Sequence, residues 1–320
     1  MVWEKFLSPK GLGASSCHTA PAIIKHYSSS TTLKKLKPMI LKRIENREKD
    51  YPIPYLIPVA QEALQARNNL IQGVSTLMKF FPVLTCKFCP EVYIGEPGHL
   101  IRTCKGYRRR SRVNLSHEWV PGSLTDIVVP VEAFRLTHMF QDIIKHEQRF
   151  DFDRVPAVVE LCRQAGADAT KCEHFGEMGS PKSSLEMAEL ANNTLKWWEM
   201  MRCGVERLMM GYPVKVCAGC GEVHVGPSGH RARHCGLFKF ERWRAYHYWK
   251  KAEVDDLVPK KIVWRRRVQD PVVLVDEGRG FYGHAPAVVD LCVKAGAFVP
   301  NKYASMMKEF GLTAPLHVPC

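Results

Sequence analysis

An internal repeat is the feature that most constrains how this chain of 320 residues can fold. A set of three cysteines and one histidine in the first half recurs in the second half, with every member displaced by 131 positions. The two sets are Cys86, Cys89, His99 and Cys104, and Cys217, Cys220, His230 and Cys235. Self-similarity at a fixed period is the signature of a duplicated structural unit. We therefore expect two homologous units that fold alike.

The repeat extends on both sides of these residues. Upstream, apolar residues spaced as on one face of a helix precede Pro82 in the first copy and Pro213 in the second. Downstream, residues 156–162 match residues 286–292, and in each case a proline begins and a glycine ends a short helix. The sequence predicts an α+β, helix-rich fold of two tandem homologous repeats. Each repeat should contain a small zinc-binding hairpin-plus-helix element.

The first residues of the chain differ in composition from the rest. The leader carries three lysines against one acidic residue, is rich in serine and threonine near residue 30, and has no compact apolar core. This composition is typical of an organellar transit peptide, mitochondrial or plastid, rather than of a secretory signal. We expect a transit peptide at 1–32, a basic N-terminal extension at 33–60, repeats at 61–170 and 191–300, a linker at 171–190 and a C-terminal tail at 301–320. No apolar stretch reaches the roughly 18 residues that span a bilayer, so we expect no membrane insertion.

Each copy of the cysteine and histidine set reads Cys-x2-Cys-x9-His-x4-Cys. Two thiolates three positions apart can point inward from one turn, and a histidine and a cysteine from a following helical turn complete a tetrahedron around zinc. Four protein ligands leave no open position, so the sequence predicts two structural zinc ions rather than catalytic ones. Iron–sulfur clusters and CxxC redox pairs also use cysteines. A redox pair alone would not explain the histidine and the third cysteine.

Several other cysteines and histidines lie near these sets. His224 and His234 are not ligands by this reasoning, because Tyr93 and a threonine replace them in the first copy, and we expect them at the surface or facing RNA. Cys162 and Cys292 lie in apolar helical segments, where cysteine is often a small buried hydrophobe. We expect both in the core.

The chain is strongly basic, with 46 lysines and arginines against 32 acidic residues and a net charge of +14. Such a surplus favours a polyanionic partner. Arginines neutralise phosphates, and aromatic rings stack on exposed bases. Basic clusters follow both cysteine and histidine sets, so we predict RNA as the partner. The candidate RNA-binding residues are Lys105, Tyr107, Arg108, Arg109, Arg110, Arg112, Arg231, Arg233, Lys239, Arg242, Arg244, Arg265, Arg266 and Arg267.

The doubled element that runs from Cys86 to His99 and from Cys217 to His230 resembles the APO (accumulation of photosystem one) family of land plants. The resemblance covers nearly all of the chain after the leader. It implies an organellar RNA-binding protein with zinc-dependent modules that promotes the splicing of group II introns. It also suggests other organellar splicing factors as partners, and it is strongest to a mitochondrial member.

The sequence contains no catalytic triad, phosphate-binding loop or paired-carboxylate motif, so we do not expect an enzyme. Two other functions stay open at this point. One is a metal-dependent nuclease that uses His224, His234 or His247. The other is an iron–sulfur cluster assembly factor.

Overall fold

The computed structural model describes residues 29–96, 117–140, 144–145, 148–168, 170, 180–227, 229, 247–275 and 278–313. The chain divides into two units, which are residues up to Glu45 and the compact remainder from Asn46. Helix α1 (Ser29–Glu48) contains Pro38 and exposes its apolar side chains from residue 36 onward. The rest of the description concerns the compact unit.

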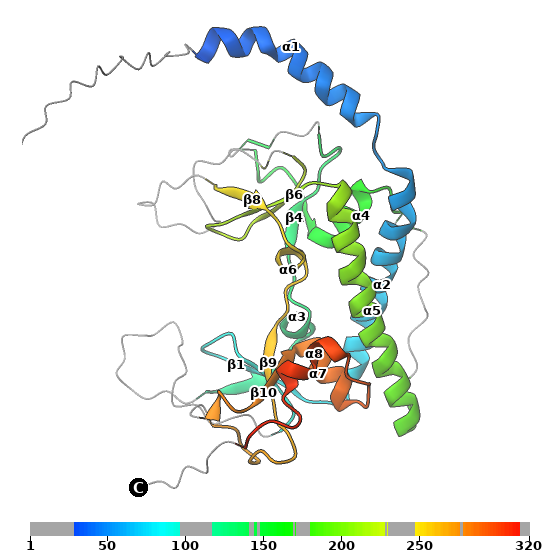
Figure 1. The fold of residues 1–320 in the computed structure, drawn as a ribbon, viewed down its shortest axis with the longest axis vertical. Helices are drawn as coiled ribbons and strands as arrows, with labels where there is room; N and C mark the ends of the chain where they lie inside the picture. Colours follow the sequence, from blue (N-terminus) through cyan, green and yellow to red (C-terminus); the bar gives the residue numbers. More distant parts are fainter. Residues whose placement is uncertain are drawn as a thin grey trace, which may run out of the picture. The chain divides into compact units, whose positions relative to one another are not determined.

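Two long helices, α2 (Ile57–Leu77) and α5 (Ser184–Gly211), pack side by side along one side of the compact unit (Figure 1). The apolar face predicted for each helix is buried. Leu70, Val74 and Leu77 in α2 are fully enclosed, and their counterparts Met201, Val205 and Leu208 in α5 are at most 2% exposed. Burial of these side chains provides the main apolar driving force for the helix pair.

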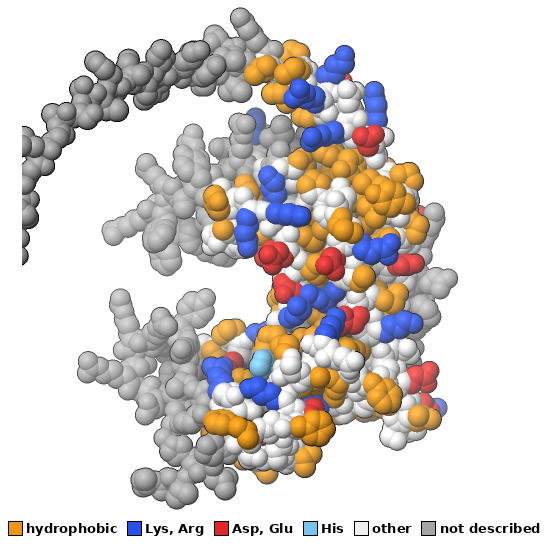
Figure 2. Space-filling view, viewed as in Figure 1, with side chains coloured by type: hydrophobic (Ala, Val, Ile, Leu, Met, Phe, Trp, Pro, Cys, Tyr) orange, Lys and Arg blue, Asp and Glu red, His pale blue; other side chains and the backbone are white. Residues whose placement is uncertain are grey.

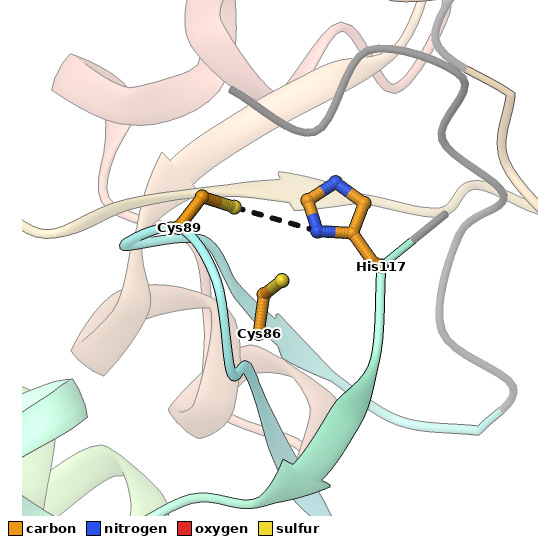
Figure 3. Close-up of side chains that lie close together, drawn as sticks. All are labelled: Cys86, Cys89 and His117. Atoms are coloured by element: carbon orange, nitrogen blue, oxygen red, sulfur yellow. Dashed lines mark hydrogen bonds between the residues drawn. The ribbon is translucent and has the colours of Figure 1, made fainter. Parts of the chain in front are cut away.

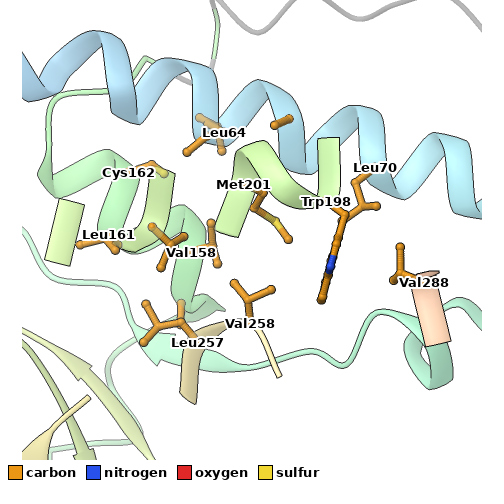
Figure 4. Close-up of a cluster of buried hydrophobic side chains, with 14 of the residues drawn as sticks. Leu64, Leu70, Val158, Leu161, Cys162, Trp198, Met201, Leu257, Val258 and Val288 are labelled. Atoms are coloured by element: carbon orange, nitrogen blue, oxygen red, sulfur yellow. The ribbon is translucent and has the colours of Figure 1, made fainter. Parts of the chain in front are cut away.

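Small residues allow the two helices to approach closely. A Cβ atom added at Gly204 of α5 would lie 2.7 Å from the Cβ of Ala63 in α2. Farther along the pair, a Cβ at Gly73 of α2 would lie 2.2 Å from the hydroxyl of Thr194. Trp198 belongs to the same buried cluster as Leu70 and Met201 (Figure 4). The helix pair is therefore a close-packed core to which both repeats contribute one helix.

A three-stranded antiparallel sheet follows α2. Its strands are β1 (Val83–Cys86), β2 (Val92–Ile94) and β3 (Trp119–Pro121), in the order β2-β1-β3. A single helical turn, α3 (Leu124–Ile127), comes next, and the carboxylate of Asp126 accepts a hydrogen bond of 2.7 Å from the backbone N–H of Ser123. Asp126, which recurs as Asp256 in the second repeat, is thus part of a capping box.

The second repeat follows the same order. Its strands are β6 (Val214–Cys217), β7 (Val223–Val225) and β8 (Trp249–Lys251). Helix α6 (Val254–Leu257) follows, and Asp256 caps it as Asp126 caps α3. The β1–β2 and β6–β7 hairpins confirm the predicted hairpins, whereas the predicted helix from His99 to Cys104 lies outside the described residues.

The later strands of each repeat associate with the other repeat. Strands β4 (Glu132–Phe134) and β5 (Arg154–Pro156) of the first repeat join the sheet of the second repeat, because Ala133 pairs in parallel with Val223. The resulting sheet has the order β5-β4-β7-β6-β8. In return, β9 (Ile262–Arg265) of the second repeat, paired with β10 (Gly283–Pro286), packs against β2 of the first. The repeats are therefore interlocked rather than arranged as separate domains.

The short helices that follow these strands close the core. Helices α4 (Ala157–Gln164) and α7 (Ala287–Lys294) begin after prolines and end before glycines, as predicted. Gly166 and Gly296 have φ angles of +88° and +96°, a conformation that favours glycine. Cys162 and Cys292 are fully buried, which confirms that they belong to the core.

Helix α8 (Asn301–Met307) lies in the segment expected only as a C-terminal tail, yet Met307 is fully buried and the helix contacts β10. Helices α2 and α5 begin at Ile57 and Ser184, inside the segments expected as extension and linker. The predicted α+β, helix-rich class is confirmed. Within the described part of the chain, no helix is both long enough and apolar enough to cross a membrane.

Candidate metal centre

The sheet of the first repeat brings two cysteines and a histidine together (Figure 3). Cys86 is the last residue of β1, Cys89 lies in the turn between β1 and β2, and His117 lies two residues before the start of β3. The pairing of Cys86 with Trp119 places the start of β3 beside that turn. The three donor atoms lie within 4.8 Å of one another, and Cys89 Sγ is 3.4 Å from His117 Nδ1.

The second repeat builds the same arrangement from Cys217, Cys220 and His247, again with the donor atoms within 4.8 Å of one another. Cys220 Sγ lies 3.6 Å from His247 Nδ1, and Cys217 pairs with Trp249 in the sheet. A sulfur and a nitrogen bound to one tetrahedral zinc ion are about 3.5 Å apart, given the usual Zn–S and Zn–N bond lengths. Both groups therefore fit the donor set and the spacing that zinc requires.

Each histidine ring is held on two sides. The His117 ring stacks on Trp119 with centroids 4.9 Å apart, and the His247 ring stacks on Trp249 at 5.0 Å. Both histidine side chains are only 1% exposed. Nδ1 of each ring faces a cysteine sulfur, and the opposite nitrogen, Nε2, faces a glutamate.

These glutamates occupy equivalent positions, two residues after the second cysteine. Glu91 Oε2 lies 3.0 Å from Nε2 of His117, and Glu222 Oε2 lies 3.9 Å from Nε2 of His247. Burial raises the pKa of Glu222, and the positive charges of Arg154 and Arg149 oppose that rise. A carboxylate behind a ligating histidine is a frequent feature of metal sites.

In each group the structure includes a histidine that was not among the ligands predicted from the sequence. His117 and His247 are separated by 130 positions, the same displacement that relates Trp119 to Trp249 two residues later. This recurrence was the signal that could have identified them. The other four predicted ligands, His99, Cys104, His230 and Cys235, lie outside the described residues.

Most predicted RNA-binding residues also lie outside the described part of the chain. They are Lys105, Tyr107, Arg108, Arg109, Arg110, Arg112, Arg231, Arg233, Lys239, Arg242 and Arg244. On the face drawn in Figure 2, the described lysine and arginine side chains are dispersed among hydrophobic and acidic ones. That face shows no concentrated basic patch formed by described residues.

The arginine run at residues 265–267 has structural partners. Arg267 is buried, donates to both carboxylate oxygens of Asp270 at 2.7 and 2.9 Å, and also donates to two backbone carbonyls. Arg265 pairs with Asp290 at 3.0 Å and with Glu309 at 2.9 Å. These contacts argue against the RNA-binding role expected for Arg265 and Arg267, because their donors are directed into the protein. Arg266 is half-buried and donates to the carbonyl of Pro271.

His224 is buried on β7, with 3% of its surface exposed, so the expectation of a surface or RNA-facing role is wrong. Its counterpart Tyr93 is equally enclosed, at 2%. Burial, with a smaller contribution from Lys215, lowers the pKa of His224 to about 4. A neutral, enclosed imidazole does not suit the nuclease role considered for this residue, whereas His234 lies outside the described residues.

Comparison of the chain with known proteins identifies its family. The APO RNA-binding family model matches residues 20–176 and 170–310, one match for each repeat, which confirms the tandem duplication.

Similar proteins of Arabidopsis thaliana include APO protein 2, chloroplastic, 38% identical over 80% of this chain and 68% of that protein. APO protein 1, chloroplastic, is 34% identical over 86% of this chain and 73% of its own length, and APO protein 3, mitochondrial, is 34% identical over 80% and 73%. No solved structure shows a significant match to the chain. Two matches that cover both repeats, and relatives aligned over most of their length, place this chain in the APO RNA-binding family.

Proposed function

We propose that this protein binds RNA in an organelle, that a structural zinc ion orders each repeat, and that the protein promotes group II intron splicing without catalysing it. The recurrence of the same Cys-Cys-His geometry in both repeats supports the zinc proposal most directly. The family supports RNA as the partner. The intron target and additional splicing factors rest on the family resemblance alone.

The zinc proposal follows from the donor set. Cys86, Cys89 and His117 offer two sulfurs and one nitrogen at the spacing that zinc needs. A tetrahedral ion then takes one more ligand, which we assign to His99 or Cys104, both in the chain between Cys89 and His117. Zinc would supply positive charge and a fixed geometry without redox chemistry. The second repeat would use Cys217, Cys220 and His247 with His230 or Cys235.

The RNA proposal follows from where the basic residues lie relative to these ligands. Residues 97–116, between Cys89 and His117, contain six lysines and arginines and no acidic residue. Residues 231–246, between Cys220 and His247, contain five basic residues and one acidic residue. Zinc bound at both ends would tether each of these segments to a rigid sheet. Tethering lowers the entropy that a basic segment loses when it binds RNA, so metal and RNA affinity should be linked.

The decisive metal test is zinc content by elemental analysis of the purified chain. We expect close to two zinc ions in the wild type and about one in Cys86→Ser or His117→Gln. Cys203→Ser is the matched control, because Cys203 is exposed on α5 and belongs to neither group. Equal zinc content in all four proteins would overturn the ligand assignment. His99→Gln and Cys104→Ser then identify the fourth ligand, since only one of them should lose zinc.

The RNA test is the salt dependence of affinity for single-stranded RNA. Changing Arg108, Arg109 and Arg110 together to glutamine should reduce the slope of log K against log salt by about 2, at roughly 0.7 per lost phosphate contact. The control changes three basic residues on α5 and at the end of α2, namely Lys79, Lys196 and Arg207, which are all exposed. An unchanged slope in the first triple variant, or an equal fall in both, would contradict the proposal.

Localisation has its own support and test. The relatives are named chloroplastic or mitochondrial, and the leader has the composition of a transit peptide. We propose a mitochondrial location. A fusion of residues 1–60 to a fluorescent protein should co-localise with a mitochondrial dye in plant cells. Accumulation in plastids would contradict the mitochondrial location, and cytosolic fluorescence would contradict the organellar proposal as a whole.

A further inference from the structure

The two candidate metal centres share a contact beyond the cysteines and histidines. Each histidine directs Nε2 toward the carboxylate of Glu91 or Glu222, while its Nδ1 faces the cysteine sulfur. The backbone fixes these glutamates in the hairpins, because Glu91 O accepts from Cys86 N at 3.0 Å and Glu222 O accepts from Cys217 N at 2.9 Å. An acceptor behind a ligating imidazole fixes its tautomer and orientation and raises its basicity.

Each glutamate also meets an arginine, and that arginine comes from the other repeat. Arg279 of the second repeat binds Glu91 of the first, with Nη2 and Oε1 2.5 Å apart. In the other direction, Arg154 of the first repeat lies 3.8 Å from Glu222 of the second, and Arg149, the sequence counterpart of Arg279, adds its charge. The exchange of strands brings these residues together over 188 positions in the first case.

The arginines are themselves held against rings at equivalent positions. The guanidinium of Arg279 lies 4.6 Å from the ring centroid of Trp264 on β9, and that of Arg154 lies 4.3 Å from the ring of Phe134 on β4. Trp264 and Phe134 are separated by 130 positions and are both buried. The same sequence of contacts, from aromatic ring to arginine to glutamate to histidine, therefore occurs twice in the molecule. Retention of these contacts in both homologous repeats indicates a constraint shared by both sites.

We propose that Glu91 and Glu222 are positioning residues that orient His117 and His247 for metal binding, and that arginines of the opposite repeat hold these glutamates in place. Each metal site is thus completed across the repeat boundary. This inference rests on the zinc binding proposed above. It adds that the affinity of each site for zinc depends on a residue in the other repeat, which sequence spacing within one repeat does not reveal.

The test measures zinc affinity of the full chain by competition with a chromophoric chelator, with two variants at one site. Glu91→Gln keeps the size of the side chain but removes its charge, and Arg279→Gln removes the cation. Glu91→Gln should weaken one of the two zinc sites by about 10- to 100-fold and leave the other unchanged. Arg279→Gln should weaken the same site by a smaller factor. The double variant should be no weaker than Glu91→Gln alone, because the arginine acts through the glutamate.

Two controls separate positioning from a general loss of stability. Glu118→Gln removes an exposed carboxylate next to His117 that pairs with Lys87, and Arg135→Gln removes an exposed arginine of the first repeat. Both should keep wild-type zinc affinity. A second readout is the visible spectrum of the cobalt(II)-substituted protein, whose ligand-field bands report the geometry at the metal. Glu91→Gln should shift these bands at full metal occupancy, an effect that lower stability alone would not produce.

The outcomes are distinct from those of the zinc proposal. If the wild type binds no zinc, the proposed function fails before this inference is reached. If it binds two zinc ions and both Glu91→Gln and Arg279→Gln remain within twofold of its affinity, the positioning role is overturned. Glu222→Gln is made in parallel and should weaken the other site. It therefore decides the question if Glu91→Gln does not fold.

Discussion

Replacing the buried His224 should remove a defined part of the acid sensitivity of this protein. His224 lies on β7, is 3% exposed, and has its ring 6.0 Å from that of Trp249. The first repeat carries Tyr93 at the same place, also enclosed and near Trp119. The substitution His224→Tyr therefore installs the residue that the homologous repeat already uses, without a group that titrates near neutral pH.

The direction and size of the effect follow from the pKa. Burial, aided by Lys215, lowers the pKa of His224 from 6.5 to about 4 in the folded chain, whereas the unfolded chain keeps the ordinary value. Between these two values the unfolded state binds a proton that the folded state excludes, so stability is complete above pH 6.5 and falls as the pH drops. A difference of about 2.5 pH units corresponds to roughly 3 kcal/mol, of which about 2 kcal/mol is lost by pH 5.

The assay is denaturant unfolding of the wild type and His224→Tyr between pH 7.5 and pH 5, with zinc in excess. Protonation of the cysteines also destabilises the protein in acid, but it does so equally in both chains. The difference between the two pH profiles therefore isolates His224. Tyrosine is larger and can lower stability at every pH, which leaves that difference in slope intact. Parallel profiles for the two proteins would refute the reasoning, because they would mean that His224 is protonated in the fold or not enclosed.

Three further substitutions test the packing. Arg267→Gln should destabilise the chain by about 3–5 kcal/mol in denaturant unfolding, since it leaves the buried carboxylate of Asp270 without its cation, while the RNA affinity of the folded protein stays the same. Gly204→Ala should lower the melting temperature although alanine favours helix, because its Cβ would lie 2.7 Å from Ala63, and overpacking of this kind costs about 1–3 kcal/mol. Asp126→Ala should cost about 1 kcal/mol through loss of the α3 cap, again measured by denaturant unfolding.

Features that depend on residues close together in the sequence could be predicted from it. The apolar spacing that includes Leu70 and Val74 predicted the buried face of α2, and Pro156 and Gly166 marked the limits of α4. The cysteine pairs predicted the turns of the two candidate metal centres. Each of these features depends on residues within about three helical turns of each other, where periodicity and backbone preference act directly.

Features that depend on distant partners could not be predicted in the same way. The sequence does not encode locally that Ala133 pairs with Val223, since a parallel bridge between repeats leaves no pattern in either strand. A run of arginines also does not reveal that Arg267 is buried. Its guanidinium group donates to the carbonyls of Lys308 and Leu312, which lie about 40 residues away in the sequence. His117 could have been identified from its recurrence as His247, 130 positions later. Its separation from Cys89 in the sequence, however, matches no familiar spacing of metal ligands.

The interlocked arrangement gives a physical reason for the duplication itself. Strand β7 has β6 on one side and β4 of the other repeat on the other, so a repeat alone would expose a strand edge that the pair covers. The helix pair also requires both repeats, because the buried face of α2 packs against that of α5. The arginine contacts to Glu91 and Glu222 follow the same exchange and so depend on both repeats at once. A single repeat would lack partners for its sheet, its helix and its candidate metal centre, so the two copies form one cooperative unit rather than two modules joined by a linker.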